Sequence, residues 1–305
     1  MQILFLIPQS DLVIDGNYRR LANLCQQRGD RVVLAFMESL AMRASAIVVD
    51  GMEMSGPLDI DAPFPDHRPC GISSMDTIWV MSLGMQGSFL DKMQMLHCAG
   101  PARILNSLES LMHLKSKYFL AADKSVIRHP ETHAGNNAAA LFDIVAGGGR
   151  WIAKPPAGSF GREVYLISRD DPNARVVLDA LTGHESGNYC LLQRYVPEIE
   201  AGEKRVLIAG GVPVAQYLRR QGMDHRTNVM QGAHIDTCDL TAAERDYCTQ
   251  IGHMLGAMGA DFVGMDLAYP WVIEFNVVNP GGILTIESLT GIDVSPAVLA
   301  HAMAT

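Results

Sequence analysis

The chain has 305 residues, of which 48% are hydrophobic and 19% charged, and its formal net charge is −9. This length exceeds that of a typical single domain, so we expect two or three packed subdomains with a sizeable core. The acidic balance argues against nucleic acid or an anionic membrane as the main partner, because neither is attracted to a negative surface.

The N-terminal part, residues 1–113, has the pattern of a small α/β domain. Strand-like runs flank a segment with helical spacing, which is a βαβ opening. A stretch rich in proline and aspartate then predicts a loop. The predicted elements are the strand Gln2–Ile7, the helix Asn17–Arg28, the strand Arg31–Phe36, the loop Ser55–Gly71 and the strand Thr77–Met81.

The remainder, residues 114–305, has a mixed α+β pattern. Gly210 and Gly211 suit the tight turn of a hairpin, and Thr241 with Glu244 forms a capping box that begins a helix. The other predicted elements are the helix Lys115–Ala122, the strand Trp151–Lys154, the loop Pro155–Arg162, the strands Glu163–Ile167, Tyr189–Arg194, Lys204–Ala209, Val212–Arg219, Phe262–Leu267 and Trp271–Val277, and a last helix after Ser295-Pro296.

Three oxygen-bearing side chains on the last two strands predict a metal site. Strand side chains alternate, so Glu274 and Asn276 share one face, and a three-residue turn would set Asp266 opposite Glu274. Mg²⁺ prefers one or two carboxylates together with phosphate oxygens. The alternative is a polar hairpin edge that faces solvent, but the flanking apolar residues favour the metal site.

Basic residues mark a second candidate feature. Lys154 ends a buried strand directly before a loop that contains Ser159 and Gly161, where an ammonium and backbone amides suit phosphate. A strand-end lysine that is merely solvated is the alternative. Four arginines that cluster in sequence either bind anions or serve as surface charges, namely Arg205, Arg219, Arg220 and Arg226.

From about residue 104 onward the chain resembles the C-terminal half of bacterial glutathione synthetases, which belong to the ATP-grasp superfamily. The order and spacing of several short motifs carry this resemblance. These motifs are Lys154-Pro, Gln193-Arg-Tyr-Val-Pro-Glu, Glu203-Lys-Arg-Val-Leu-Ile, Gly211-Val-Pro-Val, Arg226-Thr-Asn228, Phe262-Val-Gly-Met-Asp266 and Ile273-Glu-Phe-Asn-Val.

The resemblance implies an ATP-grasp fold that combines α/β and α+β parts. An N-terminal Rossmann-like domain of the pre-ATP-grasp type would span residues 1–113, and the ATP-grasp domain residues 114–305. Within the latter, the lid subdomain would span about 114–195 and the catalytic subdomain about 196–305.

The resemblance also implies roles for individual residues. ATP contacts would come from Lys117, Lys154, Ser159, Gly161, Gln193, Arg194, Tyr195, Val196 and Glu203, and metal ligands from Asp266, Glu274 and Asn276. The catalytic arginines would be Arg205 and Arg220, which also bind substrate together with Arg226, Asn228, Asn279, Gly281 and Gly282.

Three segments depart from the family pattern. The phosphate flap reads Ala157-Gly-Ser-Phe-Gly-Arg-Glu163, without the usual paired glycines. Ser82-Leu-Gly-Met-Gln86 replaces an Arg-Lys-Asp-Pro-Pro segment, and Asn279-Pro-Gly-Gly282 replaces Ser-Pro-Thr. The last two changes lie where substrates would bind.

The implied activity is ATP-dependent ligation of a carboxylate to an amine through an acyl phosphate, with ATP and Mg²⁺, or Mn²⁺ instead, as cofactors. The alternatives are a related ligase of natural-product or peptide-modifying metabolism with another acid and amine, and a non-catalytic nucleotide-binding module. The expected partners are small-molecule substrates, with no nucleic acid and no membrane. We expect a cytoplasmic location, and such families often form homo-oligomers.

Overall fold

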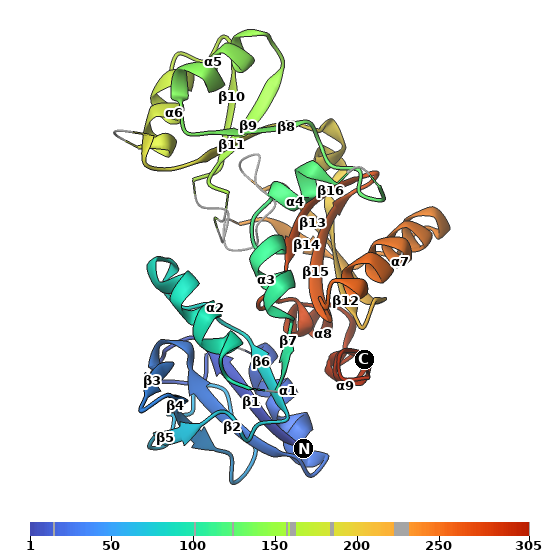
Figure 1. Cartoon of the computed structure of the whole chain (residues 1–305). Coiled ribbons are helices and arrows are strands. Elements are labelled where there is room, and N and C mark those ends of the chain that lie inside the picture. The colour runs from blue at the N-terminus through green and yellow to red at the C-terminus, as the bar shows by residue number, and fades with distance from the viewer. Residues whose placement is uncertain are drawn as a thin grey trace.

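The computed structural model describes residues 1–14, 16–100, 102–123, 125–156, 158, 163–183, 186–222 and 232–304. Figure 1 shows three parts, each built on its own sheet, that follow one another along the molecule. The N-terminal part lies at the bottom in blue, the C-terminal sheet in the centre, and a small lobe in green and yellow at the top. No described helix is long and apolar enough to span a membrane.

The N-terminal part is a seven-stranded sheet with the order β3-β4-β2-β1-β6-β7, in which β5 pairs with β4. Strand β1 is parallel to both β2 and β6, as the βαβ pattern predicted for its opening. The elements are β1 (Gln2–Ile7), α1 (Gly16–Gln27), β2 (Arg31–Phe36), a 3₁₀ turn (Met37–Ser39), β3 (Ala41–Arg43), β4 (Ala46–Glu53), β5 (Arg68–Gly71), β6 (Thr77–Val80), a 3₁₀ turn (Gln86–Ser88), α2 (Phe89–His97) and β7 (Arg103–Leu105).

Two predictions for this half of the chain need correction. The end of the expected loop Ser55–Gly71 is strand β5, which pairs antiparallel with β4. The expected helix Lys115–Ala122 is only the short helix α4 (Tyr118–Ala122), and a separate helix, α3 (Leu108–Leu114), ends before it. Helix α3 was not predicted, and it begins where the Ser107 side chain caps it by accepting from the Ser110 amide.

The upper lobe, called the lid here, is a four-stranded antiparallel sheet in the order β10-β9-β11-β8. Helices α5 and α6 pack on one face of this sheet, where Trp151 forms the centre of a separate small core. The other face carries Lys154 and Gln193. The elements are β8 (Thr132–Gly135), α5 (Ala138–Ala146), β9 (Arg150–Lys154), β10 (Tyr165–Ser168), α6 (Ala174–Thr182) and β11 (Cys190–Arg194).

The central sheet has five antiparallel strands in the order β14-β13-β12-β15-β16. The capping box predicted at Thr241 and Glu244 is present at the start of α7. The elements are a 3₁₀ turn (Pro197–Ala201), β12 (Glu203–Ala209), β13 (Val212–Arg220), β14 (His234–Asp236), α7 (Ala242–Ala257), β15 (Phe262–Ala268), β16 (Trp271–Asn276), α8 (Ile283–Thr290) and α9 (Ser295–Ala302).

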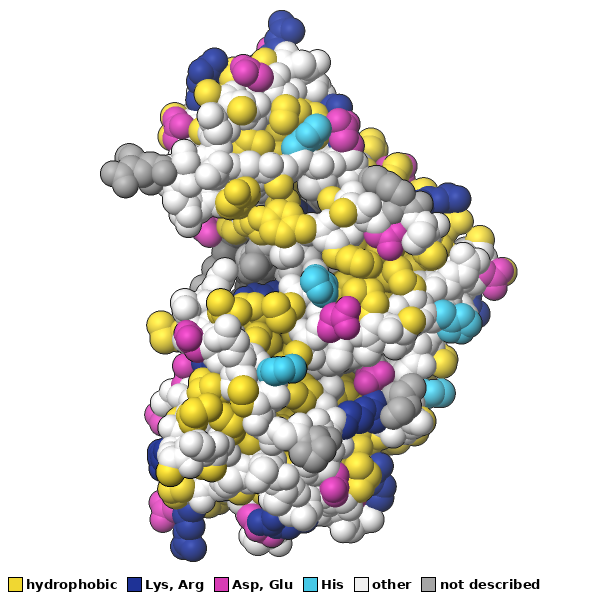
Figure 2. All heavy atoms as spheres, viewed as in Figure 1, with side chains coloured by type: hydrophobic (Ala, Val, Ile, Leu, Met, Phe, Trp, Pro, Cys, Tyr) yellow, Lys and Arg dark blue, Asp and Glu magenta, His cyan; other side chains and the backbone are white. Residues whose placement is uncertain are grey.

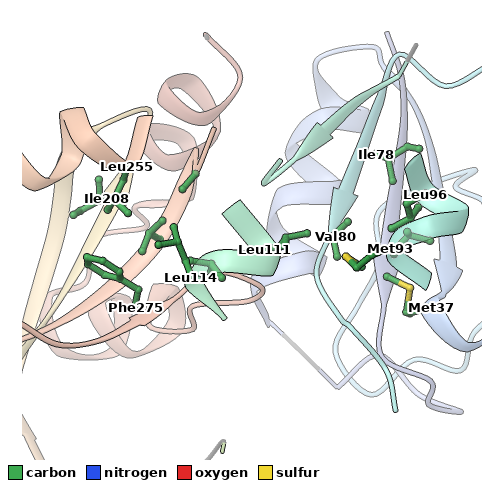
Figure 3. Packing of buried hydrophobic residues seen from close by; sticks show 14 of the residues in the cluster. Met37, Ile78, Val80, Met93, Leu96, Leu111, Leu114, Ile208, Leu255 and Phe275 are labelled. Atoms are coloured by element: carbon green, nitrogen blue, oxygen red, sulfur yellow. The ribbon is translucent and has the colours of Figure 1, made fainter. Parts of the chain in front are cut away.

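Helix α3 joins the N-terminal and central cores into one. Figure 3 shows Leu111 directed toward Val80 of the N-terminal sheet and Leu114 directed toward Phe275 of the central sheet. The Asn106 side chain adds a polar connection, because its Nδ2 donates to the Phe262 carbonyl at 2.8 Å and its Oδ1 accepts from the same residue's amide at 2.7 Å. The two parts therefore hold a fixed relative position.

We predict that Leu111→Ala lowers the free energy of unfolding by about 2–5 kcal/mol, because it leaves a cavity where the two cores meet. Leu111 is fully buried, whereas its neighbour Met112 is 46% exposed. Met112→Ala is therefore the matched control and should change stability by less than about 0.5 kcal/mol. Urea unfolding of both variants measures this, and equal effects would contradict the joined core.

Candidate active site

One face of the central sheet collects most of the polar side chains that the sequence predicted to be functional. Cross-strand pairing sets Arg205 of β12 opposite Asp266 of β15, and Asp266 opposite Glu274 of β16. Residues directly opposite one another project from the same face, as do residues two positions apart on one strand. The face therefore carries Glu203, Arg205, Arg219, Asp266, Glu274 and Asn276.

The predicted opposition of Asp266 and Glu274 is confirmed, but not by the expected three-residue turn. Ala268 pairs with Trp271, so the turn contains only two residues. A register irregularity after Asp266 supplies the extra residue on β16. Such a bulge shifts the pairing by one position, and it thereby turns Glu274 toward Asp266.

Asp266 is buried and is surrounded by donors. Its Oδ1 accepts from Arg205 Nε at 2.5 Å and from Arg219 Nη2 at 2.8 Å, and its Oδ2 accepts from Arg205 Nη2 at 3.1 Å. Burial by itself raises the pKa of Asp266, but the two guanidinium groups outweigh burial and hold the pKa well below its ordinary value. The carboxylate is therefore ionised at neutral pH and fixes both arginines.

Arg219, rather than Arg220, is the second arginine on this face. Arg219 is buried and also pairs with Glu203, whereas Arg220 projects from the opposite face, where it pairs with the exposed Asp236 of β14. The hairpin of β12 and β13 contains a register irregularity at Leu207, which exchanges the faces of the two arginines. The structure thus does not bring Arg220 to the site.

Glu274 and Asn276 complete an oxygen-rich corner beside Asp266. Glu274 is 29% exposed and its Oε1 lies 3.0 Å from Lys117 Nζ, while Asn276 Nδ2 lies 3.4 Å from Asp266 Oδ2. Two carboxylates and an amide oxygen are donors that suit Mg²⁺ when phosphate oxygens supply the other ligands. Among the described residues, no cluster of three or more His, Cys, Asp or Glu side chains forms a ready metal site.

The lid presents a buried lysine to the same region. Lys154 Nζ donates to Gln193 Oε1 at 2.7 Å on the face of the lid sheet that carries no helix. Burial, together with the neighbouring ammonium of Lys117, lowers the pKa of Lys154 to about 8. Glu274 pairs with Lys117 at 3.0 Å, and the two neighbouring ammonium groups together favour an anionic ligand.

The four residues predicted to line an adenine slot lie at the end of β11 and just beyond it. Gln193 points toward Lys154, but Arg194 projects from the other face of the lid sheet, where its guanidinium lies 4.0 Å from the Trp151 ring. Tyr195 and Val196 are buried, and the Tyr195 hydroxyl donates to Glu200 at 3.0 Å. Arg194 can therefore offer a ligand only its backbone on the inner face.

The segment that follows β16 closes one side of the site. The Pro280 carbonyl accepts from Arg205, and Asn279 Oδ1 accepts from Asn17 Nδ2 of α1 at 2.7 Å. Gly264 permits this approach, because a Cβ there would lie 2.8 Å from Pro280. Gly281 and Gly282 follow with positive φ angles, and within this segment Pro280 supplies the contact with Arg205.

Four predicted residues, Ser159, Gly161, Arg226 and Asn228, lie outside the described residues. Figure 2 shows the surface hollowed between the lid and the rest of the molecule. Lys154 belongs to β9 of the lid, and the carboxylates of Asp266 and Glu274 belong to β15 and β16 of the central sheet.

Comparisons with known proteins show which family and which fold this chain resembles. A family model described as the ATP-grasp domain of prokaryotic glutathione synthetase matches residues 118–291. Glutathione synthetase of Gloeobacter violaceus is 28% identical over 230 residues, which are 72% of this chain and 70% of that protein. Glutathione synthetase of Escherichia coli is 34% identical over 187 residues, which are 61% of this chain and only 58% of that protein.

Solved structures are similar over nearly the whole chain. The D-cycloserine synthetase DcsG has a TM-score of 0.66 at 16% identity and covers 99% of this chain and 100% of its own. A RimK domain ATP-grasp protein of Sphaerobacter thermophilus also has a TM-score of 0.66, at 15% identity, with 100% of both chains covered. The ATP-grasp ligase PsnB, complexed with a minimal precursor, has a TM-score of 0.64 at 15% identity, with 99% and 98% covered. These likenesses show the fold alone.

We predict that the two neighbouring arginines differ sharply in their effect on stability. Arg219→Ala removes a partner from the buried Asp266 and Glu203, and should lower the free energy of unfolding by about 3–5 kcal/mol. Arg220→Ala removes an exposed pair and should cost less than about 1 kcal/mol. Urea unfolding at neutral pH tests this, and a larger effect of Arg220→Ala would refute the assigned faces.

Proposed function

Because the chain belongs to the ATP-grasp domain family of prokaryotic glutathione synthetases, we propose that it is an ATP-dependent ligase that joins a carboxylate to an amine. The family match agrees with the resemblance, the ATP-grasp fold and the C–N ligase class predicted from the sequence. The observation that carries the proposal is the meeting of Lys117 and Lys154 with the carboxylates of the central sheet, which provides cations for phosphates beside oxygen ligands for a metal ion.

The proposed reaction has two steps. An oxygen of the acid attacks the γ-phosphorus of ATP, the bond to the bridging oxygen breaks, and ADP leaves with the electron pair. The amine nitrogen then attacks the acyl carbon, inorganic phosphate leaves, and the nitrogen gives up a proton to solvent. No covalent bond to the protein is required, so the protein acts by positioning its ligands and neutralising their charge.

Separate groups of residues serve the two ends of this reaction. Lys117 and Lys154 would neutralise the phosphates, while Gln193, the Arg194 backbone, Tyr195 and Val196 would line the adenine slot and Glu203 would hold the ribose. Arg205 and Arg219 face the acid and would stabilise the tetrahedral oxyanion. The catalytic role predicted for Arg220 therefore passes to Arg219 in our proposal.

Asp266, Glu274 and Asn276 would hold Mg²⁺, or Mn²⁺ in its place. The bound ion would offset the phosphate charge. Arg205 and Arg219 both donate to Asp266 in this structure, and Asp266 Oδ2, which accepts from a single guanidinium nitrogen, would offer its other lone pair to the ion.

A specific observation favours an acid other than γ-glutamylcysteine. The segment Ser82–Gln86, which stands in place of the family's Arg-Lys-Asp-Pro-Pro, contains no cationic side chain. The nearby ammonium of Lys92 is buried and pairs with Glu38 at 2.9 Å. The same Glu38 oxygen accepts from the Met85 amide at 2.5 Å. We therefore propose a ligase of natural-product or peptide-modifying metabolism as the second candidate.

The experiment that tests the proposal measures Mg²⁺-dependent release of ADP with γ-glutamylcysteine and glycine, beside a panel of other acids and amines, with products identified by mass. Formation of glutathione supports the first candidate, and turnover with other pairs supports the second. ATP binding without turnover by any pair would favour the non-catalytic nucleotide-binding module. The cytoplasmic location and homo-oligomeric state remain predictions from the resemblance.

We predict that Glu274→Gln lowers turnover by about 100-fold or more, because a neutral amide is a poorer ligand for a divalent ion than a carboxylate. Glu198→Gln is the matched control, since Glu198 is exposed on the 3₁₀ turn before β12. ADP release at saturating ATP, together with thermal unfolding, measures both variants. Normal turnover by a folded Glu274→Gln protein would refute the metal site.

We predict that kcat/KM for ATP falls as the pH rises through about 8, because Lys154 of the free enzyme loses its proton there. Below that pH the ammonium is charged and attracts the phosphates. Bound phosphates favour the charged form, so the fall in kcat should occur at higher pH. Lys154→Arg keeps its charge throughout and should lack this alkaline fall. An unchanged fall in that variant would assign it to another group.

A further inference from the structure

A short stretch of chain between α4 and the lid is bonded to both sheets of the site. The Val272 amide of β16 donates to the Arg128 carbonyl at 2.8 Å, and the Arg194 amide of β11 donates to the Glu131 carbonyl at 2.7 Å. His129 lies between these two connections and is buried, with 7% of its surface exposed. Its side chain therefore sits where the lid meets the central sheet.

A chain of buried hydrogen bonds runs through this imidazole from the lid to the central sheet. Lys154 Nζ donates to Gln193 Oε1 at 2.7 Å, Gln193 Nε2 lies 2.9 Å from His129 Nε2, and His129 Nδ1 lies 2.7 Å from the Val272 carbonyl oxygen. Val272 is two residues before Glu274 on the same strand. This series of hydrogen bonds thus connects Lys154, the proposed phosphate ligand, to β16, the strand that carries the proposed metal ligand Glu274.

The groups at the two ends of this series of hydrogen bonds determine which atom donates and which accepts in each bond. A backbone carbonyl can only accept, so His129 Nδ1 carries the hydrogen and donates to Val272. In the neutral ring Nε2 then holds a lone pair, which requires the NH₂ group of Gln193 on that side. The amide oxygen of Gln193 consequently faces Lys154, which can only donate.

We propose that His129 is a positioning residue for the phosphate-binding lysine of the lid. Its Nε2 lone pair selects the one orientation of the Gln193 amide that accepts from Lys154, and its Nδ1 hydrogen ties this arrangement to β16. His129 itself touches neither ATP nor substrate. This inference rests on the proposed function only in identifying Lys154 as a phosphate ligand.

The positioning matters because Lys154 is a buried cation beside a second cation. Desolvation and the ammonium of Lys117 both disfavour its charged form. If the Gln193 amide turned over, its NH₂ group would face the ammonium, and two donors would oppose each other in a buried site. Lys154 would then lose its acceptor and move away from the place where phosphate binds.

Two substitutions at His129 separate this role from simple packing. His129→Phe keeps a flat ring but removes both nitrogens. A glutamine side chain extends as far as Nε2, so His129→Gln can offer its amide oxygen to Gln193 Nε2. The matched control is His253→Phe, because His253 is exposed on α7.

The first measurement is titration calorimetry with Mg²⁺-ATP and with adenosine, which lacks the phosphates that Lys154 contacts. We expect His129→Phe to weaken ATP about tenfold, to leave adenosine unchanged, and to raise KM for ATP more than it lowers kcat. His129→Gln should recover most of the lost ATP affinity. Unchanged ATP affinity, or equal losses for ATP and adenosine, would overturn the proposal.

The second measurement needs no activity. Nitrogen-15 NMR of the full-length protein labelled at histidine, assigned with His129→Phe, reports which ring nitrogen of His129 carries the proton. A hydrogen on Nδ1 alone at neutral pH supports the proposal, and a hydrogen on Nε2 contradicts it. A wild-type protein that binds no ATP would refute the proposed function, whereas the spectrum would still decide the role of His129.

Discussion

The buried carboxylate of Asp266 is the constraint on which the site depends. A carboxylate without partners in a protein interior is costly, and this one is balanced by two guanidinium groups from β12 and β13. Because Asp266 holds Arg205 and Arg219 in fixed positions, three strands present a rigid set of charges rather than mobile surface side chains. The same arrangement keeps the arginines on the side where Pro280 approaches. Rigid donors are effective at developing negative charge, since they need no reorganisation when the charge appears.

The second requirement is that the lid holds Lys154 in one fixed position relative to the charged side chains of the central sheet. Lys117 and Lys154 repel each other, so the fold must compensate them until an anion arrives. Glu274 does this for Lys117, and the Gln193 amide does it for Lys154. Among the described residues the lid has its own hydrophobic core, and the hydrogen bonds of residues 128–131 connect it to the central sheet. A ligand that contacts both the lid and the central sheet would therefore change a few polar contacts between them.

Parts of this arrangement follow from local sequence, and others depend on irregularities that sequence does not show. Alternation on β16 predicted that Glu274 and Asn276 share one face. The predicted opposition of Asp266 and Glu274 is present, but a two-residue turn with a bulge produces it instead of the expected three-residue turn. In a hairpin without the irregularity at Leu207, Arg220 would share the face of Arg205, so a sequence-based choice between adjacent arginines depends on that one shift. The hairpin of β3 and β4 was missed because its turn places Ala44 and Ser45 at positive φ, where glycine or asparagine normally signals such a turn.

The N-terminal sheet shows why the identity of the acid substrate is harder to predict from the sequence than the ATP site. The residues proposed to face phosphate and metal lie within or directly before the stretch matched by the family model, but the segment Ser82–Gln86 lies outside it. This segment follows β6, next to β1, where the strand order changes direction and ligands of open parallel sheets bind. Gly84 lies directly against the ion pair of Glu38 and Lys92, since a Cβ at Gly84 would lie 1.9 Å from Glu38 Oε1. The Lys92 ammonium beside this segment is thus already compensated by Glu38, which removes one means of recognising a carboxylate.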